Sequence, residues 1–252
     1  MAKNTPKKTQ SLKDSKGLPQ NPLKKSLKQK SSDKPYSNAP QNLQKSFQNN
    51  SSKPPKIKIP KKPTLRILGG IYKGKSLQMA DLEITRSSKA ILKESFFNTL
   101  GAALGGVNFI EFFAGSGSIG IEALSRGAKN AIFFENNQAS YRTLTQNLKS
   151  LQITAYKAYF GDTFKLYPTL LETFKSPCIA YLDPPFDFRN NAQGIYQKCF
   201  AMIEHFNPDI FKIITLEHYF NLEIPHFIGD FCLHKTKKFG KSALSYFYVV
   251  ES

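Results

Sequence analysis

The sequence between residues 107 and 216 alternates between short apolar runs and longer amphipathic segments, and this alternation limits the possible folds most strongly. Apolar runs typical of buried strands cover 107–113, 130–135, 154–160, 178–183 and 210–216. Segments with helical spacing lie at 118–127, 137–150, 162–175 and 193–206. Strands that alternate with helices predict an α/β fold, with a mostly parallel sheet covered on both faces.

The pattern changes before this region. Residues 65–73 resemble two strands around Gly69-Gly70, which predicts an N-terminal β-hairpin within residues 65–80. A serine cap, helical apolar spacing and Gly101 at the end predict a helix over 87–101.

The pattern also changes at the C-terminal end. Residues 226–234 and 243–250 resemble two strands, and only a short basic connection, 235–241, separates them. A parallel connection needs a crossover of a dozen or more residues, so we expect this last pair to be antiparallel. The core of the fold is therefore predicted to extend over 107–252.

The first 64 residues contain sixteen lysines and two aspartates, which account for +14 of the formal net charge of +18. They are rich in Lys, Gln, Asn, Ser and Pro, and such a segment buries too little apolar area to offset the entropy of ordering. We predict a disordered basic tail over 1–64 and one folded domain over 65–252. The tail either attracts polyanions or is a solvated extension.

Some function classes are disfavoured. The sequence has no apolar segment of membrane-spanning length and no signal-peptide core, which predicts a protein without membrane contact. Its three cysteines are widely spaced and odd in number, which favours a reducing cytoplasm, and no Cys or His pair has metal-ligand spacing. We therefore expect neither a metal site nor a disulfide framework.

A glycine-rich turn follows the first predicted strand of the sheet. Gly115, Gly117 and Gly120 have GxGxxG spacing, and glycines there permit a tight turn and close approach of a ligand. Glu135 ends the next strand, where a carboxylate can accept hydrogen bonds from ribose hydroxyls. Alone, this pattern fits any nucleotide-cofactor fold, or an ordinary glycine-rich turn.

Two further acidic positions narrow the choice of ligand. Glu111 precedes the glycine turn, where its charge would repel a pyrophosphate and suit a cation such as the sulfonium of S-adenosylmethionine. Asp162 follows the third strand, where it can accept a hydrogen bond from an adenine amine or cap the next helix.

The fourth predicted strand ends in Asp183-Pro184-Pro185-Phe186. Two prolines cannot continue a ladder, so a carboxylate, the Pro184 carbonyl and an aromatic ring lie at the carboxyl edge of the sheet. Ligands bind at this edge in open α/β folds. The group can hold a flat ring that bears an amine, or it can be a strand-ending turn with a capping aspartate and a core phenylalanine.

Together these segments resemble class I methyltransferases that act on exocyclic amines. Over residues 65–250 the chain resembles the RsmD family, which methylates the N2 amine of a guanine in 16S ribosomal RNA. The stretches that carry the resemblance are Arg66-Ile67-Leu68-Gly69-Gly70, Tyr72-Lys73-Gly74-Lys75, Lys93-Glu94-Ser95-Phe96-Phe97-Asn98, Phe112-Phe113-Ala114-Gly115-Ser116-Gly117, Gly120-Ile121-Glu122-Ala123-Leu124, Asp183-Pro184-Pro185-Phe186 and Phe239-Gly240 with Ser242-Ala243-Leu244.

The resemblance implies a Rossmann-like sheet, S-adenosylmethionine as cofactor, no metal and a monomeric enzyme. It implies a cofactor site made of Glu111, Ala114, Gly115, Gly117, Glu135 and Asp162. Asp183 and the Pro184 carbonyl would hold the guanine amine while Phe186 stacks on the base. Basic residues expected to contact RNA phosphates are Arg66, Lys73, Lys75, Arg86, Lys89 and Lys93 near the N-terminal end, and Lys235, Lys237, Lys238 and Lys241 near the C-terminal end.

The chain departs from the family pattern at three places. Arg86-Ser87-Ser88 stands where relatives usually have Arg-Pro-Thr, and Ile91 stands where they have an arginine. Asn137 replaces an acidic residue that the family often has two positions after the ribose carboxylate. No contact is therefore assigned to residues 91 and 137.

Other functions remain open. A methyltransferase for adenine N6 or cytosine N4 would use the same amine acceptors, a nicotinamide-dependent oxidoreductase is favoured only by the glycine spacing, and an RNA-binding factor could retain the fold without activity. The substrate could be free 16S ribosomal RNA or a small-subunit assembly intermediate, and the target nucleotide is not indicated.

Overall fold

The computed structural model describes residues 63–80, 86–170, 177–185 and 192–250. The predicted disordered tail, apart from its last two residues, lies outside the described residues, and so does Phe186. Arg86 begins a described helix, but its side chain is also outside the described part.

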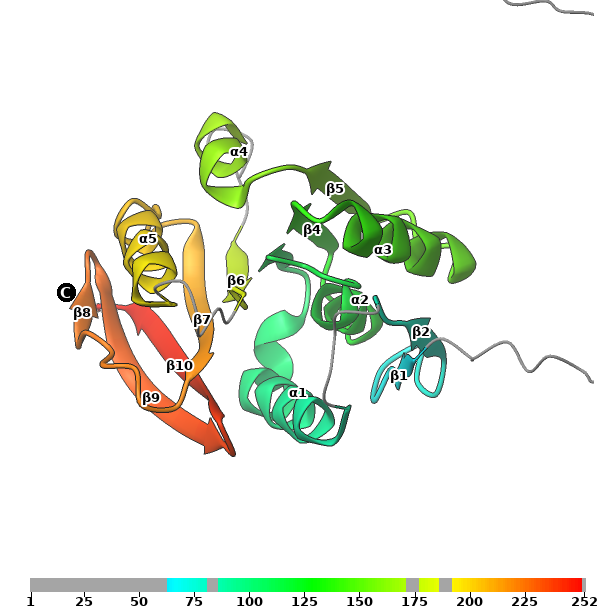
Figure 1. Ribbon diagram of the computed structural model, residues 1–252, viewed down its shortest axis with the longest axis horizontal. Helices are drawn as coiled ribbons and strands as arrows, with labels where there is room; N and C mark the ends of the chain where they lie inside the picture. The colour runs from blue at the N-terminus through cyan, green and yellow to red at the C-terminus, as the bar shows by residue number, and fades with distance from the viewer. Residues whose placement is uncertain (1–62, 81–85, 171–176, 186–191, 251–252) are drawn as a thin grey trace, which may run out of the picture. The chain divides into compact units, whose positions relative to one another are not determined.

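An eight-stranded sheet forms the centre of the fold, in the order β5-β4-β3-β6-β7-β10-β9-β8 (Figure 1). The five parallel strands are β5 (Tyr156–Phe160), β4 (Asn130–Glu135), β3 (Asn108–Phe112), β6 (Cys178–Leu182) and β7 (Phe211–Tyr219). The antiparallel strands are β10 (Ser242–Val249), β9 (Phe231–Phe239) and β8 (Phe227–Ile228). The predicted mixed sheet with an antiparallel C-terminal pair is confirmed.

Helices cover both faces of the sheet. One core packs the sheet against α1 (Arg86–Leu100), the 3₁₀ helix η1 (Gly101–Leu104), α2 (Ser118–Ser125) and α3 (Gln138–Ser150). The other packs it against α4 (Thr163–Leu170) and α5 (Ala192–Glu204). All five residues of β6 are buried, as expected for a strand covered on both sides. Among the described residues, no helix combines the length and apolar character that crossing a bilayer requires.

The N-terminal hairpin forms, but with a different second strand. β1 (Thr64–Arg66) pairs antiparallel with β2 (Ser76–Gln78), so residues 71–73, predicted as a strand, belong to the turn. The reason is tertiary: the Ile71 amide donates to the Ser125 carbonyl at 2.8 Å and the Tyr72 amide to Ser125 Oγ at 2.9 Å. These donors bind the end of α2, not a neighbouring strand.

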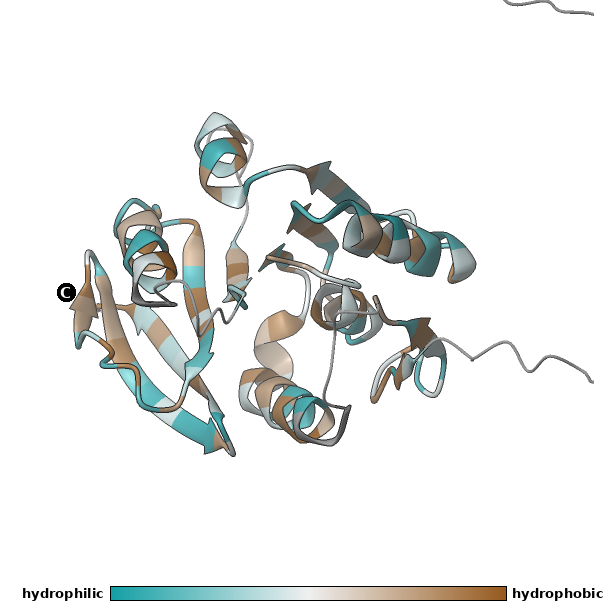
Figure 2. Ribbon diagram, in the orientation of Figure 1, coloured by the Kyte–Doolittle hydropathy of each residue, from teal (hydrophilic) through white to brown (hydrophobic). Residues whose placement is uncertain are grey.

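Residues 235–241 were predicted as a basic connection, and this is also wrong, because most of them belong to strand β9. β9 continues to Phe239, and the reversal occurs at Gly240, whose φ of 62° is left-handed. Two lysines of this segment make cation–π contacts from the strand: the Lys235 ammonium lies 5.5 Å from the centre of the Tyr246 ring, and the Lys238 ammonium lies 5.8 Å from that of Phe220. Figure 2 shows hydrophilic residues along this end of β9.

Candidate active site at the carboxyl edge of the sheet

The loops after β3 and β6 start side by side at the carboxyl edge of the sheet. Phe112 pairs with Leu182 and with Phe134 across the parallel ladders. The Ala114 amide then donates to the Phe134 carbonyl at 2.8 Å, and the Asp183 amide lies 3.5 Å from the Phe112 carbonyl. This register brings the glycine turn and the Asp-Pro-Pro segment together, as the sequence predicted.

Glu111 binds the start of α2, the helix that follows the glycine turn. Its carboxylate is buried and accepts the backbone amides of Ile119 at 3.3 Å and Gly120 at 2.8 Å, at the start of α2. The positive end of the helix dipole stabilises a negative charge at this place. The carboxylate therefore holds the helix and at the same time lines the pocket described below.

The turn itself depends on left-handed backbone and on close packing. Phe113, Gly115 and Gly117 have φ angles of 62°, 54° and 77°. A Cβ on Gly120 would lie 2.4 Å from the Phe133 ring and 2.9 Å from the Glu111 carboxylate. Only glycine fits at position 120, and Phe113 is a non-glycine residue in a strained conformation of the kind that clusters at functional sites.

Glu135 anchors the other side of the turn. Its two carboxylate oxygens accept the backbone amides of Gly115 and Asn137, each at 2.6 Å. Each oxygen has two acceptor sites, so the carboxylate retains capacity for ribose hydroxyls. Asn137, which departs from the family pattern, caps α3 by accepting the amides of Ala139 at 2.9 Å and Ser140 at 3.0 Å.

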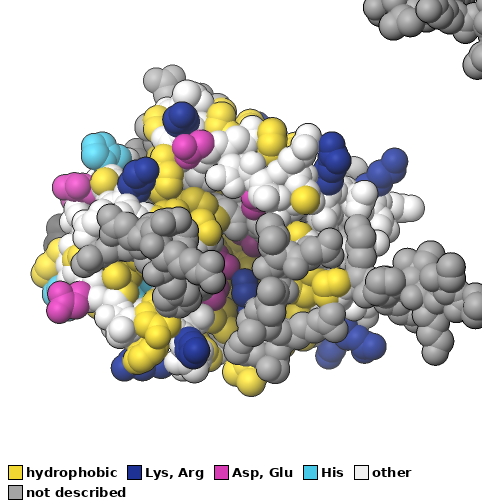
Figure 3. Space-filling view, viewed as in Figure 1, with side chains coloured by type: hydrophobic (Ala, Val, Ile, Leu, Met, Phe, Trp, Pro, Cys, Tyr) yellow, Lys and Arg dark blue, Asp and Glu magenta, His cyan; other side chains and the backbone are white. Residues whose placement is uncertain are grey.

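A pocket of about 50 Å³ joins the turn to Asp183. Its lining residues are Leu65, Lys89, Leu92, Lys93, Glu111, Phe113, Ala114, Gly115, Ser118, Ile119, Asp183 and Glu217. Four residues predicted for the cofactor or catalytic site, Glu111, Ala114, Gly115 and Asp183, thus meet in one pocket, whereas Gly117, Glu135, Asp162 and Pro184 are outside its lining. Figure 3 shows acidic side chains next to a basic one near the middle of the molecule.

Asp183 carries its carboxylate into this pocket from the end of β6. The Lys89 ammonium on α1 lies 3.4 Å from Asp183 Oδ2, and the Asp183 side chain is 23% exposed. Lys89 was predicted as a phosphate contact, and the structure pairs it with the proposed amine acceptor. Pro184 is buried and Pro185 is exposed.

The structure adds a carboxylate that the sequence analysis missed. Glu217, on β7, is 3% exposed and accepts a hydrogen bond of 2.6 Å from the Tyr181 hydroxyl. Burial, and next the charge of Asp183, raise the pKa of Glu217 from 4.5 to about 7. The signal in the sequence is that Glu217 directly follows 210–216, the apolar run predicted as the fifth strand.

Asp162 acts as a helix cap in this structure. Its Oδ1 accepts the Phe164 amide at 2.9 Å, and its carbonyl accepts the Leu166 amide at 2.9 Å, at the start of α4. This is one of the two roles that the sequence left open. The side chain is exposed, so contact with an adenine amine stays a prediction.

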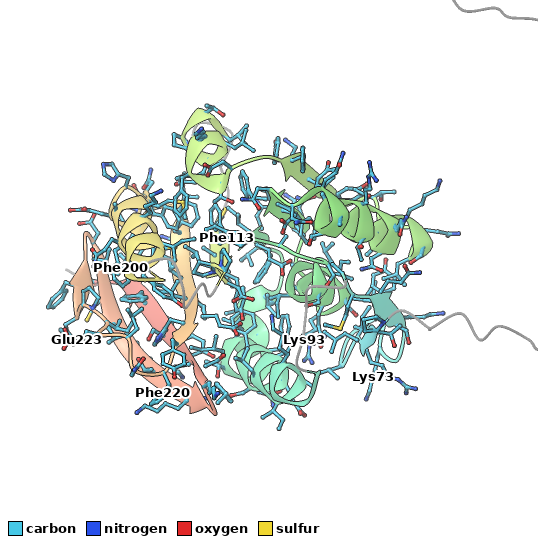
Figure 4. The ribbon with its side chains drawn as sticks, viewed as in Figure 1. Lys73, Lys93, Phe113, Phe200, Phe220 and Glu223 are labelled. Atoms are coloured by element: carbon cyan, nitrogen blue, oxygen red, sulfur yellow. The ribbon has the colours of Figure 1, made fainter. Side chains whose placement is uncertain are left out.

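Lys93 was predicted to lie on an RNA-binding surface, and this is wrong. It is 1% exposed, pairs with Glu122 Oε2 at 2.7 Å and donates to the Arg66 carbonyl at 2.9 Å. Burial is the main influence on its ammonium and lowers the pKa of Lys93. Helical spacing places Lys93 on the face of α1 that packs against α2, so it joins the hairpin to the domain. In Figure 4 it lies inside the domain, next to α1.

The remaining predicted RNA contacts differ in their surroundings. Arg66, Lys73 and Lys75 are exposed on the hairpin, and Lys73 lies at the periphery in Figure 4. Lys237, in contrast, donates to Thr99 Oγ1 of α1 at 2.9 Å, which joins β9 to α1. Among the described residues, no group of three or more His, Cys, Asp or Glu side chains is placed to hold a metal ion.

Comparison with known proteins agrees with this geometry. A family model described as "Conserved hypothetical protein 95" matches residues 65–248. The protein named "Putative rRNA methyltransferase YlbH" of Bacillus subtilis is 29% identical over 182 residues, covering 72% of this chain and 97% of the relative. Ribosomal RNA small subunit methyltransferase D of Haemophilus influenzae is 32% identical over 151 residues, covering 57% and 76%.

A solved structure shows the same fold. The Escherichia coli protein titled "Putative methyltransferase yhhF" superposes with a TM-score of 0.61 and 25% identity, over 74% of this chain and 98% of that one. The family model spans the hairpin, the glycine turn and the Asp-Pro-Pro segment, which are the parts that build the pocket. The chain therefore belongs to the RsmD family of ribosomal RNA small-subunit methyltransferases.

Proposed function

We propose that the protein transfers a methyl group from S-adenosylmethionine to the N2 amine of a guanine in 16S ribosomal RNA. The observation that carries the proposal is that one pocket contains both the glycine turn after β3 and the Asp183 carboxylate after β6. The first is suited to a nucleotide-like donor and the second to an amine, so the two reactants would meet there.

The residues present fit the donor. When bound, S-adenosylmethionine supplies a methyl group made electrophilic by its sulfonium. Three carboxylates, Glu111, Asp183 and Glu217, line the pocket and favour a cation. Whole-ligand pockets measure roughly 300–1,000 Å³, so this pocket suits the reacting group alone. Glu135 and Asp162 would hold the ribose and the adenine outside it.

The acceptor side follows from the end of β6. Asp183 and the Pro184 carbonyl would accept hydrogen bonds from the two N–H groups of the amine, which aims the nitrogen lone pair at the methyl group. Positioning of this kind can contribute about 7–11 kcal/mol to lowering a barrier. Phe186, outside the described residues, is proposed to stack on the base.

The RNA would be held by charge outside the pocket. Arg66, Lys73 and Lys75 are exposed on the hairpin, and phosphate contacts from such residues position RNA without selecting a sequence. Arg86 is proposed to join them. Ile91, which replaces a family arginine, is 62% exposed on α1 and supplies no charge there.

The test is to incubate the protein with methyl-labelled S-adenosylmethionine and either free 16S ribosomal RNA or a small-subunit assembly intermediate. Mass analysis of the nucleosides should show N2-methylguanosine. N6-methyladenosine or N4-methylcytosine would instead support the alternative amine substrates. Asp183→Ala should lower methyl transfer by at least about 100-fold, whereas Asp230→Ala, at an exposed turn, should not. A near wild-type rate for Asp183→Ala would exclude the proposed acceptor role.

A further inference from the structure

Glu217 is a buried carboxylate in the pocket where the proposed reaction takes place. It lies on β7, one strand away from Asp183, and lines the same pocket. We propose that Glu217 is the base that finally receives the proton lost by the methylated amine, with Asp183 as the contact between them. This inference rests on the proposed function, since it assigns a role in the same reaction.

The chemistry requires such an acceptor. The nitrogen lone pair forms the new N–C bond while the S–C bond of the donor breaks and leaves its electron pair on sulfur. As this bond forms, the nitrogen becomes cationic and loses one proton in the same step, and the N–H electron pair returns to nitrogen. The proton passes by way of the Asp183 carboxylate to Glu217 and leaves to water with the product.

The groups around Glu217 determine how well it binds a proton. From β6, the Tyr181 hydroxyl donates to it at 2.6 Å, and from β10 the Ser242 hydroxyl also contacts it. Asp183 raises its proton affinity through repulsion, and Lys89 on α1 lowers it through attraction. The Tyr196 hydroxyl on α5 lies in the field of both carboxylates. Glu217 thus has two neutral hydroxyl donors, while the charges of Asp183 and Lys89 act on it in opposite directions.

Asp183 and Glu217 differ in their surroundings. The Asp183 carboxylate lies 3.4 Å from the Lys89 ammonium and is 23% exposed. Glu217 is shielded from water, and burial followed by the charge of Asp183 raises its pKa to about 7. A general base works best when its pKa is near the working pH, so Glu217 is matched to neutral conditions.

Glu217→Gln tests the inference, because glutamine keeps an oxygen acceptor for the Tyr181 hydroxyl but cannot take a proton. Single-turnover methylation of 16S ribosomal RNA should rise with pH in the wild type and level off above about 7. In Glu217→Gln the rate should fall about 100-fold and lose this inflection, with S-adenosylhomocysteine affinity within about threefold of the wild type. Glu223→Gln, at an exposed position, is the matched control.

A second readout requires no turnover. The ¹³C resonance of the Glu217 carboxyl, identified by its absence in Glu217→Gln, should titrate near pH 7. Tyr181→Phe removes a hydrogen bond that favours the ionised form, so both this titration and the rate inflection should move to higher pH. If Glu217→Gln does not fold, the Tyr181→Phe result decides.

An inflection that persists in Glu217→Gln, a carboxyl that titrates below pH 5, or an unmoved inflection in Tyr181→Phe would each overturn the role of Glu217 alone. A wild type that methylates no ribosomal RNA at any pH would instead overturn the proposed function, together with the inference that depends on it.

Discussion

Replacing Lys93 with methionine should destabilise the protein, because it removes one cation from a buried charge network. Glu122 Oε1 accepts the Leu68 amide at 3.1 Å and Arg126 Nε at 3.0 Å, whereas Oε2 faces the Lys93 ammonium at 2.7 Å. Lys93 also donates to the Arg66 carbonyl of β1. Lys93→Met keeps an unbranched, apolar stem but removes the ammonium, so Oε2 loses this partner.

The magnitude follows from the burial of both groups. Removing one partner of a buried ion pair costs about 3–5 kcal/mol, and the lower end applies because Arg126 stays bound to Glu122. We therefore expect a loss of about 3 kcal/mol in the free energy of unfolding, which lowers Tm by about 6–12 °C for a domain of this size. Urea and thermal unfolding followed by circular dichroism at pH 7 measure both quantities.

Lys73→Met is the matched control, since Lys73 is exposed on the same hairpin. It should change stability by less than about 0.5 kcal/mol. The double change Lys93→Met with Glu122→Gln should lower the free energy of unfolding by less than the sum of the two single changes, because the carboxylate that lost its lysine is then removed as well. The reasoning is refuted if Lys93→Met unfolds at the same urea concentration as Lys73→Met.

Three further changes have defined outcomes. The pKa of Glu217 is higher in the folded protein than its ordinary 4.5, so the folded state binds more protons than the unfolded state between pH 4.5 and 7. The free energy of unfolding of the wild type should therefore fall by up to about 3 kcal/mol as the pH rises over this range. Urea unfolding of Glu217→Gln at several pH values should lack this component. Gly120→Ala places a methyl group 2.4 Å from a ring carbon and should cost about 1–3 kcal/mol in thermal unfolding, whereas Gly105→Ala, with its nearest contact at 3.4 Å, should cost far less. Reversing the charges of Lys73 and Lys75 to Glu should weaken binding of 16S ribosomal RNA and flatten its dependence on salt, and unchanged binding in a filter assay would exclude the hairpin as a phosphate contact.

The hairpin is attached to the glycine turn through α3, which relates the two halves of the proposed site. Asn147 of α3 exchanges two hydrogen bonds of 2.9 Å with the backbone of Gln78 on β2, and it also donates to the Ser116 carbonyl at 3.0 Å. One buried amide thus contacts both the hairpin and the turn. The proposed RNA contacts are therefore held in a defined position relative to the proposed donor site.

Elements that depend on local patterns were predicted well. The strand over 130–135 has the predicted bounds, and the helix predicted over 137–150 begins one residue later. Apolar periodicity is a property of neighbouring residues, so it can be read directly from the chain. The residues near Gly70 and Lys235 were predicted wrongly, because there the backbone donors of the turn bind Ser125 of α2 and the Lys235 ammonium contacts Tyr246 on the neighbouring strand.

The sequence by itself determined the order of the elements, the glycine turn, the Asp-Pro-Pro segment and the family to which they belong. Only the tertiary structure decided that Glu217 lines the pocket, that Lys93 is buried and that Asp183 pairs with Lys89. The physical reason is that burial and charge pairing depend on which strands become neighbours. β6 lies between β3 and β7, so residues more than a hundred positions apart, Glu111 and Glu217, line one pocket.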